Sequence, residues 1–189
     1  MTKLIYGVGI NDVKGSRSTP EYDLWLSVLF RCYSSGFQSR SKTYHGCYVS
    51  DNFKRFSYFR SWCQDQIGFG VGGFELDKDL LVKGNKIYSE EYCVFLPREI
   101  NILLAKRTAS RGVHPIGVSF NKARSNFEAY ISMNGRKKSL GRHKTSVDAF
   151  YAYKTAKEKH VKDIAKKHQG VIDQRAYEAL YRYIVEITD

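Results

Sequence analysis

A run of alternating apolar and polar residues in the second half of the chain dictates a β-strand. One face of residues 127–133 would carry Phe127, Ala129, Ile131 and Met133, and the other Glu128, Tyr130 and Ser132. Side chains alternate with a period of two in a strand, so this pattern predicts a strand buried on one face only. Ile116, Val118 and Phe120 repeat the pattern and predict a neighbouring strand.

The residues that follow predict how this sheet is completed. Asn134-Gly135 is a strong hairpin signal because both residues tolerate positive φ, and it predicts a third strand over residues 136–142. Thr145 and Asp148 have the spacing of a helix N-terminal cap, which opens a predicted helix to about Lys167. We therefore expect a three-stranded antiparallel sheet that is covered by one helix and leaves its other face free.

The same part of the chain holds all of its excess charge. Residues 105–169 contain 16 Lys and Arg against 4 Asp and Glu, whereas the rest has 15 of each sign, for a net charge of +12. Charge concentrated in this way favours a polyanion as partner, since each cation placed at a phosphate releases condensed counterions. The alternative is a solvated basic helix that only keeps the protein soluble.

The free face of the predicted sheet has the chemistry to contact duplex DNA. It carries Asn, Tyr, Ser, Lys and Arg, which reach both base edges and phosphates, and a three-stranded sheet is narrow enough to enter the major groove. The sequence therefore predicts double-stranded DNA as the partner. An ordinary water-exposed sheet remains the alternative.

Residues 117–160 resemble the Apetala-two/ethylene-response-factor DNA-binding domain. The resemblance rests on Gly117-Val118, the Phe127-x-Ala129-x-Ile131 strand, Leu140-Gly141 and the helix that opens with Thr or Ser and Ala. It implies that bases and phosphates are contacted by Ser119, Asn121, Tyr130, Ser132, Lys137 and Ser139. Charge and position add Lys122, Arg124 and Arg142. Where the plant domains place Arg and Trp on the face that reads the bases, this chain has Ser and Asn, so Lys and Arg should supply most of the affinity.

The first half of the chain predicts helices followed by a hairpin and a helix. A cap at Thr19 with Pro20 opens a helix to Ser34, a polar loop covers 34–43, and an aromatic helix runs from about Asp51 to Gln66. Residues 73–81 and 92–96 predict two strands around a Gly84-Asn85 turn, and residues 98–104 a helix. Such a hairpin and helix can hold one hard divalent cation, such as Mg²⁺, on a phosphate. The fold class predicted for the whole chain is α+β.

Residues 21–104 resemble the HNH homing endonucleases of phages. The matching positions are Trp25, Leu29, Arg31, Cys32 and Tyr33; Phe53 to Trp62; Leu76 to Asp79; Gly84 and Asn85; Tyr88 and Ser89; Cys93, Phe95 and Pro97; and Ile100 and Asn101. The resemblance implies a metal-dependent DNA endonuclease with a ββα-metal fold in which Asp77 and Asn101 hold the Mg²⁺ or another divalent cation.

The chain departs from that family at the catalytic base. Lys78 stands where the family has His, and Asp77 and Asp79 beside it would raise its pKa rather than lower it. His45 is the only imidazole before residue 114 that this half could recruit. Two hypotheses stay open. One is cleavage of phosphodiesters with Asp77, Lys78 and His45 as catalytic residues, and the other is an inactive DNA-binding or host-factor-inhibiting protein.

The cysteines, the search for targeting segments and the domain boundaries complete the sequence analysis of the chain. Cys32, Cys47, Cys63 and Cys93 form no CxxC pair, so no zinc is expected and the thiols should be reduced and mostly buried. No export signal and no membrane span are visible, which predicts the cytoplasm, that of the host if a phage encodes the chain. We expect domains at 1–104 and 105–169 joined by a basic link over 106–114, and a C-terminal helix in 170–189 that packs on a domain or binds a partner protein.

Overall fold

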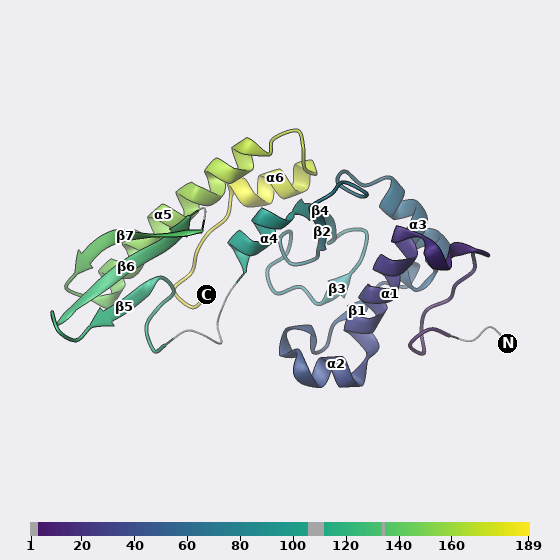
Figure 1. Cartoon of the computed structure of the whole chain (residues 1–189), viewed down its shortest axis with the longest axis horizontal. Helices are drawn as coiled ribbons and strands as arrows, with labels where there is room; N and C mark the ends of the chain where they lie inside the picture. Colours follow the sequence, from purple (N-terminus) through teal and green to yellow (C-terminus); the bar gives the residue numbers. More distant parts are fainter. Residues whose placement is uncertain (1–3, 106–111, 134) are drawn as a thin grey trace. The chain divides into compact units, whose positions relative to one another are not determined.

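The structure, a computed structural model, describes residues 4–105, 112–133 and 135–189 and has the predicted α+β class (Figure 1). It divides into two compact units. The first runs to Asn101 and includes Gly170–Ala176, and the second comprises Ile102–Gln169 and Tyr177–Asp189. Two predictions fall partly outside the described residues: Asn134 of the hairpin turn, and residues 106–111 of the link.

The first unit combines helices with two short pairs of strands. Its elements are α1 (Pro20–Tyr33), α2 (Ser35–Arg40), β1 (Tyr48–Val49), α3 (Phe56–Gln64), β2 (Phe74–Asp77), β3 (Ile87–Tyr88), β4 (Val94–Pro97) and the start of α4 (Arg98–Leu104). The Thr19 side chain accepts a hydrogen bond from the Tyr22 backbone N–H, as its position before Pro20 predicts.

The aromatic stripes of α1 and α3 form the core of this unit. Trp25, Phe53, Phe56 and Phe59 are fully buried, and the Trp25 indole N–H donates to the Phe53 backbone oxygen at 2.7 Å. This bond satisfies the one polar group that a buried indole brings into a core. All four cysteines are buried and none forms a disulfide, and burial raises the pKa of the Cys32 thiol to about 12.

Helix α3 begins later than the sequence predicts. Residues 52–54 form a 3₁₀ turn, Arg55 is extended, and the α-helix starts at Phe56. The backbone of Ile10 accounts for the difference: its N–H donates to the Lys54 oxygen and its oxygen accepts from the Phe56 N–H. A bridge to a distant segment thus takes backbone groups that a continuous helix would use itself.

The segment predicted as a loop after α1 is in fact largely helical. It contains α2 and a 3₁₀ turn over Lys42–Tyr44. The Phe37 ring packs between Phe30 and Tyr44, with ring centroids 4.9 and 5.4 Å apart. Packing of this one aromatic residue accounts for the folding of an otherwise polar segment onto the rest of the unit. A single apolar residue produces no periodic pattern, so the sequence did not predict the helix.

The predicted hairpin-and-helix is present as β2, β4 and α4. Strands β2 and β4 pair antiparallel, with Phe74 opposite Pro97 and Asp77 opposite Val94, and α4 follows directly. The connection is longer than a hairpin turn because β3 lies within it and pairs in parallel with β1. This ββα arrangement places Asp77 at the end of one strand and Asn101 in the helix.

The second unit contains the three-stranded antiparallel sheet with strand order β5 (Val118–Asn121), β6 (Asn126–Met133) and β7 (Arg136–His143). Helix α5 (Ser146–Lys167) covers one face (Figure 1). Thr145 caps it by accepting from the Asp148 N–H at 3.1 Å, as predicted. The core lies between sheet and helix and contains Ile131, Phe150, Tyr153 and, partly buried, Val118, Met133 and Leu140.

The C-terminal helix, α6 (Gln174–Tyr181), covers only part of the segment 170–189 in which it was predicted. The chain after it is not helical and packs on α5, where Val185 is buried. Glu158 accepts from the Val185 N–H at 2.9 Å, and Lys154 donates to the Val185 oxygen at 2.6 Å. These two side chains of α5 take the backbone bonds of Val185 that a longer helix would have made within itself.

Gly117, the residue before β5, lies close against Tyr153 of α5, and this contact allows the packing to be tested. Its φ is +77°, and a Cβ there would lie 2.1 Å from the Tyr153 ring. Gly135 has a similar φ of +74° but open space around it. Gly135→Ala should cost about 1 kcal/mol of backbone strain, and Gly117→Ala about 3 kcal/mol because overpacking is added.

Urea unfolding of both variants, followed by circular dichroism at 222 nm, checks this difference. Equal destabilisation by the two alanines would contradict the described contact between Gly117 and Tyr153.

Candidate nucleic-acid interface

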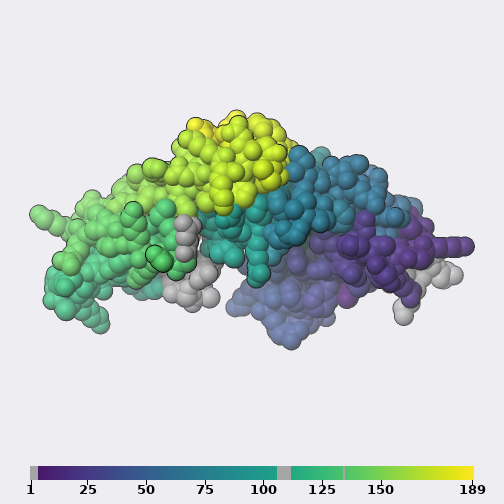
Figure 2. Space-filling view, turned by 45° about the horizontal axis from the view of Figure 1, so that its top comes forward, coloured from purple at the N-terminus to yellow at the C-terminus, as the bar shows by residue number. Residues whose placement is uncertain are grey.

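The face of the sheet opposite α5 gathers polar side chains from all three strands. Cross-strand partners share a face, and the register pairs Ser119 with Glu128, Ser132 with Lys137, Tyr130 with Ser139 and Glu128 with Arg142. Figure 2 shows the atoms of these strands in green at the surface. We call this surface the outer face and define it by Ser119, Asn121, Glu128, Tyr130, Ser132, Lys137, Ser139 and Arg142.

Seven of the nine residues predicted to contact DNA lie on the outer face, and the other two lie beside it. Lys122 and Arg124 are in the four-residue turn between β5 and β6, and both are exposed. The Arg124 N–H donates to the Asn121 side-chain oxygen at 3.2 Å, which ties the turn to the end of β5. The strand register thus brings the predicted residues together on one side of the sheet.

Glu128 lies on the middle strand of the outer face and was not predicted as a site residue. Its carboxylate accepts from the Tyr130 hydroxyl at 2.6 Å and from the Asn121 amide at 3.0 Å. The guanidinium groups of Arg124 and Arg142 each lie 3.7 Å from it. The alternation placed Glu128 on this face, but only the three-dimensional register shows that four other side chains converge on it.

Lys137 and Tyr130 form a second contact on the outer face. The ammonium of Lys137 lies 3.9 Å from the centroid of the Tyr130 ring, a cation–π geometry. Hydrogen bonding to Glu128 raises the pKa of the Tyr130 hydroxyl, so this phenol stays protonated at neutral pH. The face therefore presents a neutral donor-acceptor set between cations.

The lysines of α5 form a competing basic surface. Lys159, Lys162, Lys166 and Lys167 are exposed, but several have partners within the unit. Lys159 forms an ion pair with Asp163 at 2.9 Å, and Lys162 lies over the Tyr181 ring. Part of the charge of this surface is thus already engaged in contacts within the unit.

In the first unit, Asp77 is engaged in a tight turn after β2. Its Oδ1 accepts from the backbone N–H groups of Asp79 and Leu80 at 2.9 and 2.7 Å. Burial raises the pKa of its carboxyl, against the lowering effect of these two bonds. Asp77 thus has a local structural role whether or not it also binds a cation.

Lys78 is a buried cation, with 5 % of its surface exposed. Its ammonium donates to Asp79 at 2.7 Å and to the Asn85 backbone oxygen at 2.8 Å, while the Asn85 amide donates back to the Lys78 oxygen at 2.8 Å. This reciprocal bonding closes the loop between β2 and β3. Two hydrogen bonds thus commit the Lys78 ammonium to the structure of the loop.

Asn101 contacts Glu75 rather than Asp77. Its amide nitrogen donates to the Glu75 carboxylate at 3.2 Å, and Arg98 lies 3.6 Å from the same carboxylate. Its Oδ1 is buried with no hydrogen-bond partner. Glu75 and Asp77 alternate onto the same face of β2. The residues that could hold a hard cation therefore include Glu75, a candidate that the sequence analysis did not name.

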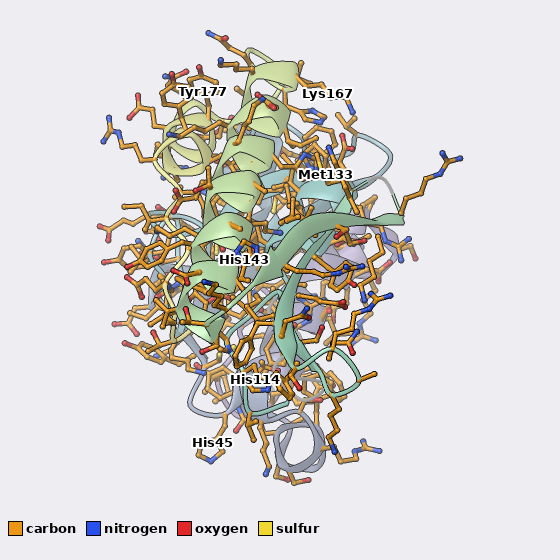
Figure 3. All side chains as sticks on the ribbon, turned by 90° about the vertical axis from the view of Figure 1, so that its left-hand side faces the viewer. His45, His114, Met133, His143, Lys167 and Tyr177 are labelled. Atoms are coloured by element: carbon orange, nitrogen blue, oxygen red, sulfur yellow. The ribbon has the colours of Figure 1, made fainter. Side chains whose placement is uncertain are left out.

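His45 is exposed, and its side chain is not joined to Asp77 or Lys78 by any hydrogen bond or ion pair among the described residues. Its loop does approach that region, since Lys86 donates to the Thr43 oxygen at 2.9 Å. Figure 3 shows the labelled imidazole pointing away from the ribbon. The structure thus brings the backbone near the predicted catalytic residues, but leaves the imidazole in solvent.

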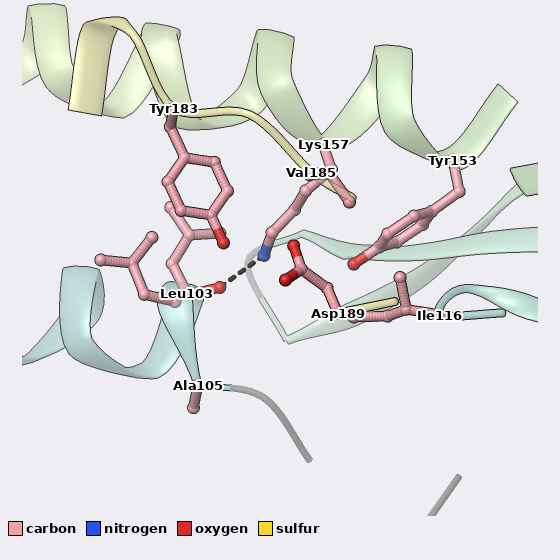
Figure 4. A pocket seen from close by; sticks show the side chains of 9 residues that line it. Leu103, Ala105, Ile116, Tyr153, Lys157, Tyr183, Val185 and Asp189 are labelled. Atoms are coloured by element: carbon pink, nitrogen blue, oxygen red, sulfur yellow. Dashed lines mark hydrogen bonds between the residues drawn. The ribbon is translucent and has the colours of Figure 1, made fainter. Parts of the chain in front are cut away.

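A small cavity in the second unit has an unusual buried amine. Lys157 and Tyr153 of α5, the end of α4 and the C-terminal segment line it, and Lys157 donates to the Leu103 oxygen (Figure 4). Burial lowers the pKa of Lys157 to about 8. The cavity has a volume of about 20 Å³. It can hold about one water molecule and is too small for a substrate.

A larger groove in the first unit is acidic. It has about 470 Å³ open to water-sized molecules and is lined by Asp51, Glu90 and Glu91, with Lys54 as its cation. Glu90 accepts from Ser50, Asn52 and Tyr58, and Lys54 donates to Asp51 at 2.7 Å. A groove with this charge would repel a phosphodiester backbone, so it is not a candidate DNA site.

Comparison with known protein families, curated proteins and solved structures finds no match to this chain. In the parts of the chain that the structure describes, no group of three or more His, Cys, Asp or Glu side chains could hold a metal ion. Nor is any described helix both long and apolar enough to cross a membrane. The resemblances noted above therefore rest on the residues quoted for them.

The buried contacts of Lys78 predict a large stability effect. Lys78→Ala would leave the Asn85 oxygen unpaired and remove the Asp79 ion pair, at a cost of about 3 kcal/mol to the first unit. Lys86→Ala, eight residues later on the exposed side of the same loop, should cost about 0.5 kcal/mol.

Both tryptophans lie in the first unit, so tryptophan fluorescence during urea unfolding reports its stability. Similar costs for the two alanines would show that Lys78 does not hold the loop as described.

Proposed function

We propose that this protein binds double-stranded DNA through the outer face of its three-stranded sheet. The observation that supports it best is the convergence of Ser119, Asn121, Tyr130, Ser132, Lys137, Ser139 and Arg142 on one face, with Lys122 and Arg124 at its edge. The opposite face is filled by α5, so these side chains are the ones available to a ligand.

The chemistry of this face suits a duplex groove. Lys122, Arg124, Lys137 and Arg142 supply four cations for phosphates, while hydroxyl and amide groups between them can donate to and accept from base edges. In this proposal the cations provide most of the affinity. The uncharged groups add a modest preference among sequences, because Ser and Asn make fewer base contacts than a bidentate Arg.

We also propose, as a second candidate, that the first unit cleaves DNA with a divalent cation. The buried, unpartnered Oδ1 of Asn101 favours it, since an oxygen donor left without a hydrogen bond fits a hard cation. Asp77 and Asn101 would hold the ion, which would stabilise charge on the phosphate. The competing hypothesis is an inactive DNA-binding or host-factor-inhibiting protein, and the engaged Lys78 and exposed His45 support it.

The salt dependence of duplex binding tests the outer face. Four cations at phosphates predict a slope of log affinity against log salt of about −3.6 for the full chain. Replacing Arg124 and Lys137 by Ala should flatten it by about 1.8, whereas Lys162→Ala with Lys166→Ala on α5 removes the same charge and should change it by about 0.5 or less.

Fluorescence anisotropy with a labelled duplex between 50 and 300 mM NaCl would measure these slopes. If the two pairs of substitutions flatten the slope equally, the protein binds DNA through its overall charge and not through the outer face.

Plasmid nicking tests the cleavage proposal. Full-length protein with supercoiled plasmid and Mg²⁺ or Mn²⁺ should give nicked circles that depend on the metal, and Asp77→Asn should reduce the rate at least about a hundredfold. Asp65→Asn, at an exposed carboxylate outside the ββα segment, is the matched control and should cut as the wild type does. If wild type and Asp77→Asn nick the plasmid at the same rate, the cleavage proposal is wrong. DNA binding without cleavage would then be the remaining hypothesis.

A further inference from the structure

The outer face carries a carboxylate on its middle strand, which conflicts with simple attraction of a polyanion. Glu128 is the one acidic residue on this face, and every other charged group on it or at its edge is a cation. A carboxylate facing DNA phosphates would weaken binding unless it serves another purpose. Its contacts indicate that purpose.

Glu128 joins residues from all three strands and the turn. One carboxylate oxygen accepts from Tyr130, and the other accepts from Asn121 and faces the guanidinium groups of Arg124 and Arg142. These hydrogen bonds hold the pKa of the Glu128 carboxyl below its usual value, with the Tyr130 bond the main cause. The group is therefore ionised at neutral pH, hydrogen-bonded to Tyr130 and Asn121, and ion-paired with Arg124 and Arg142.

Ion pairing of Arg124 and Arg142 with Glu128 weakens their interaction with a phosphate. A carboxylate and a phosphate oxygen compete for the same guanidinium donors, since both accept the same charge-assisted bonds. Arg124 and Arg142 provide two of the four cations at this face, so Glu128 restrains half of the charge that a polyanion would meet.

We propose that Glu128 is a positioning residue that limits indiscriminate binding of polyanions. It restrains Arg124 and Arg142 and orients Asn121 and Tyr130, so that a ligand binds most tightly when it also forms hydrogen bonds with these uncharged groups. This inference rests on the proposed DNA binding for its biological meaning. Its physical content, restraint of two arginines by one carboxylate, can be tested separately.

The test compares Glu128→Gln with Asp163→Asn in the full chain. Each substitution removes one negative charge from the second unit, but Asp163 is on α5 and pairs with Lys159. Glutamine keeps an oxygen for Asn121 or Tyr130, and circular dichroism verifies that the fold is retained. The probes are heparin, which has charge but no base edges, and a 20-base-pair duplex of mixed sequence.

Glu128→Gln should bind heparin about fivefold more tightly at 150 mM NaCl, because two arginines are released, while Asp163→Asn should change the affinity less than about twofold. The gain for the duplex should be smaller, so the ratio of duplex to heparin affinity falls. Arg124→Ala should also cost more heparin affinity in the Glu128→Gln background than in the wild type, a coupling that general charge effects do not produce.

Equal effects of the two substitutions on heparin, or no coupling with Arg124, would overturn the role of Glu128. A wild-type protein that binds heparin but not the duplex would overturn the proposed DNA binding, and the heparin comparison would still decide whether Glu128 restrains the arginines.

Discussion

The second unit depends on the alternation of side chains along β6 beneath α5. Ala129 and Ile131 are buried because they face the helix, and Gly117 lets the neighbouring strand approach Tyr153 without a clash. A shift of one residue in register would bring Glu128 and Tyr130 into that core and expose Ile131. Burial of the apolar face thus fixes which polar side chains are presented together on the other face.

Cationic side chains in the two units have different roles. In the first, Lys78 is buried and bonded to a carboxylate and a backbone oxygen, so its charge closes a loop. In the second, Lys137 and Arg142 are exposed on a sheet face and remain accessible to a ligand. Side chains with the same formal charge can therefore have different roles in one chain. Burial and hydrogen bonding determine whether a cation stabilises the fold or is accessible to a ligand.

Much of this fold could be predicted from local sequence signals. The caps at Thr19 and Thr145, the alternation around β6 and the hairpin-and-helix of β2, β4 and α4 all follow from residues near each other in sequence. The later start of α3 and the non-helical chain at Val185 could not be predicted, because each depends on a partner distant in sequence. The helix around Phe37 was missed although its aromatic partners, Phe30 and Tyr44, are near in sequence, because a single aromatic residue produces no periodic pattern. The convergence on Glu128 and the contact of Asn101 with Glu75 likewise needed three-dimensional register.

In the proposed complex, DNA contacts the outer face of the sheet and not the lysines of α5. Backbone amide chemical shifts, recorded by NMR while a duplex is added to the full chain, test it most directly. If DNA binds the outer face, the largest shifts will occur at β5–β7, including Ser119, Ser132 and Ser139, with residues 159–167 little changed. Shifts concentrated on residues 159–167, with β5–β7 unaffected, would contradict it.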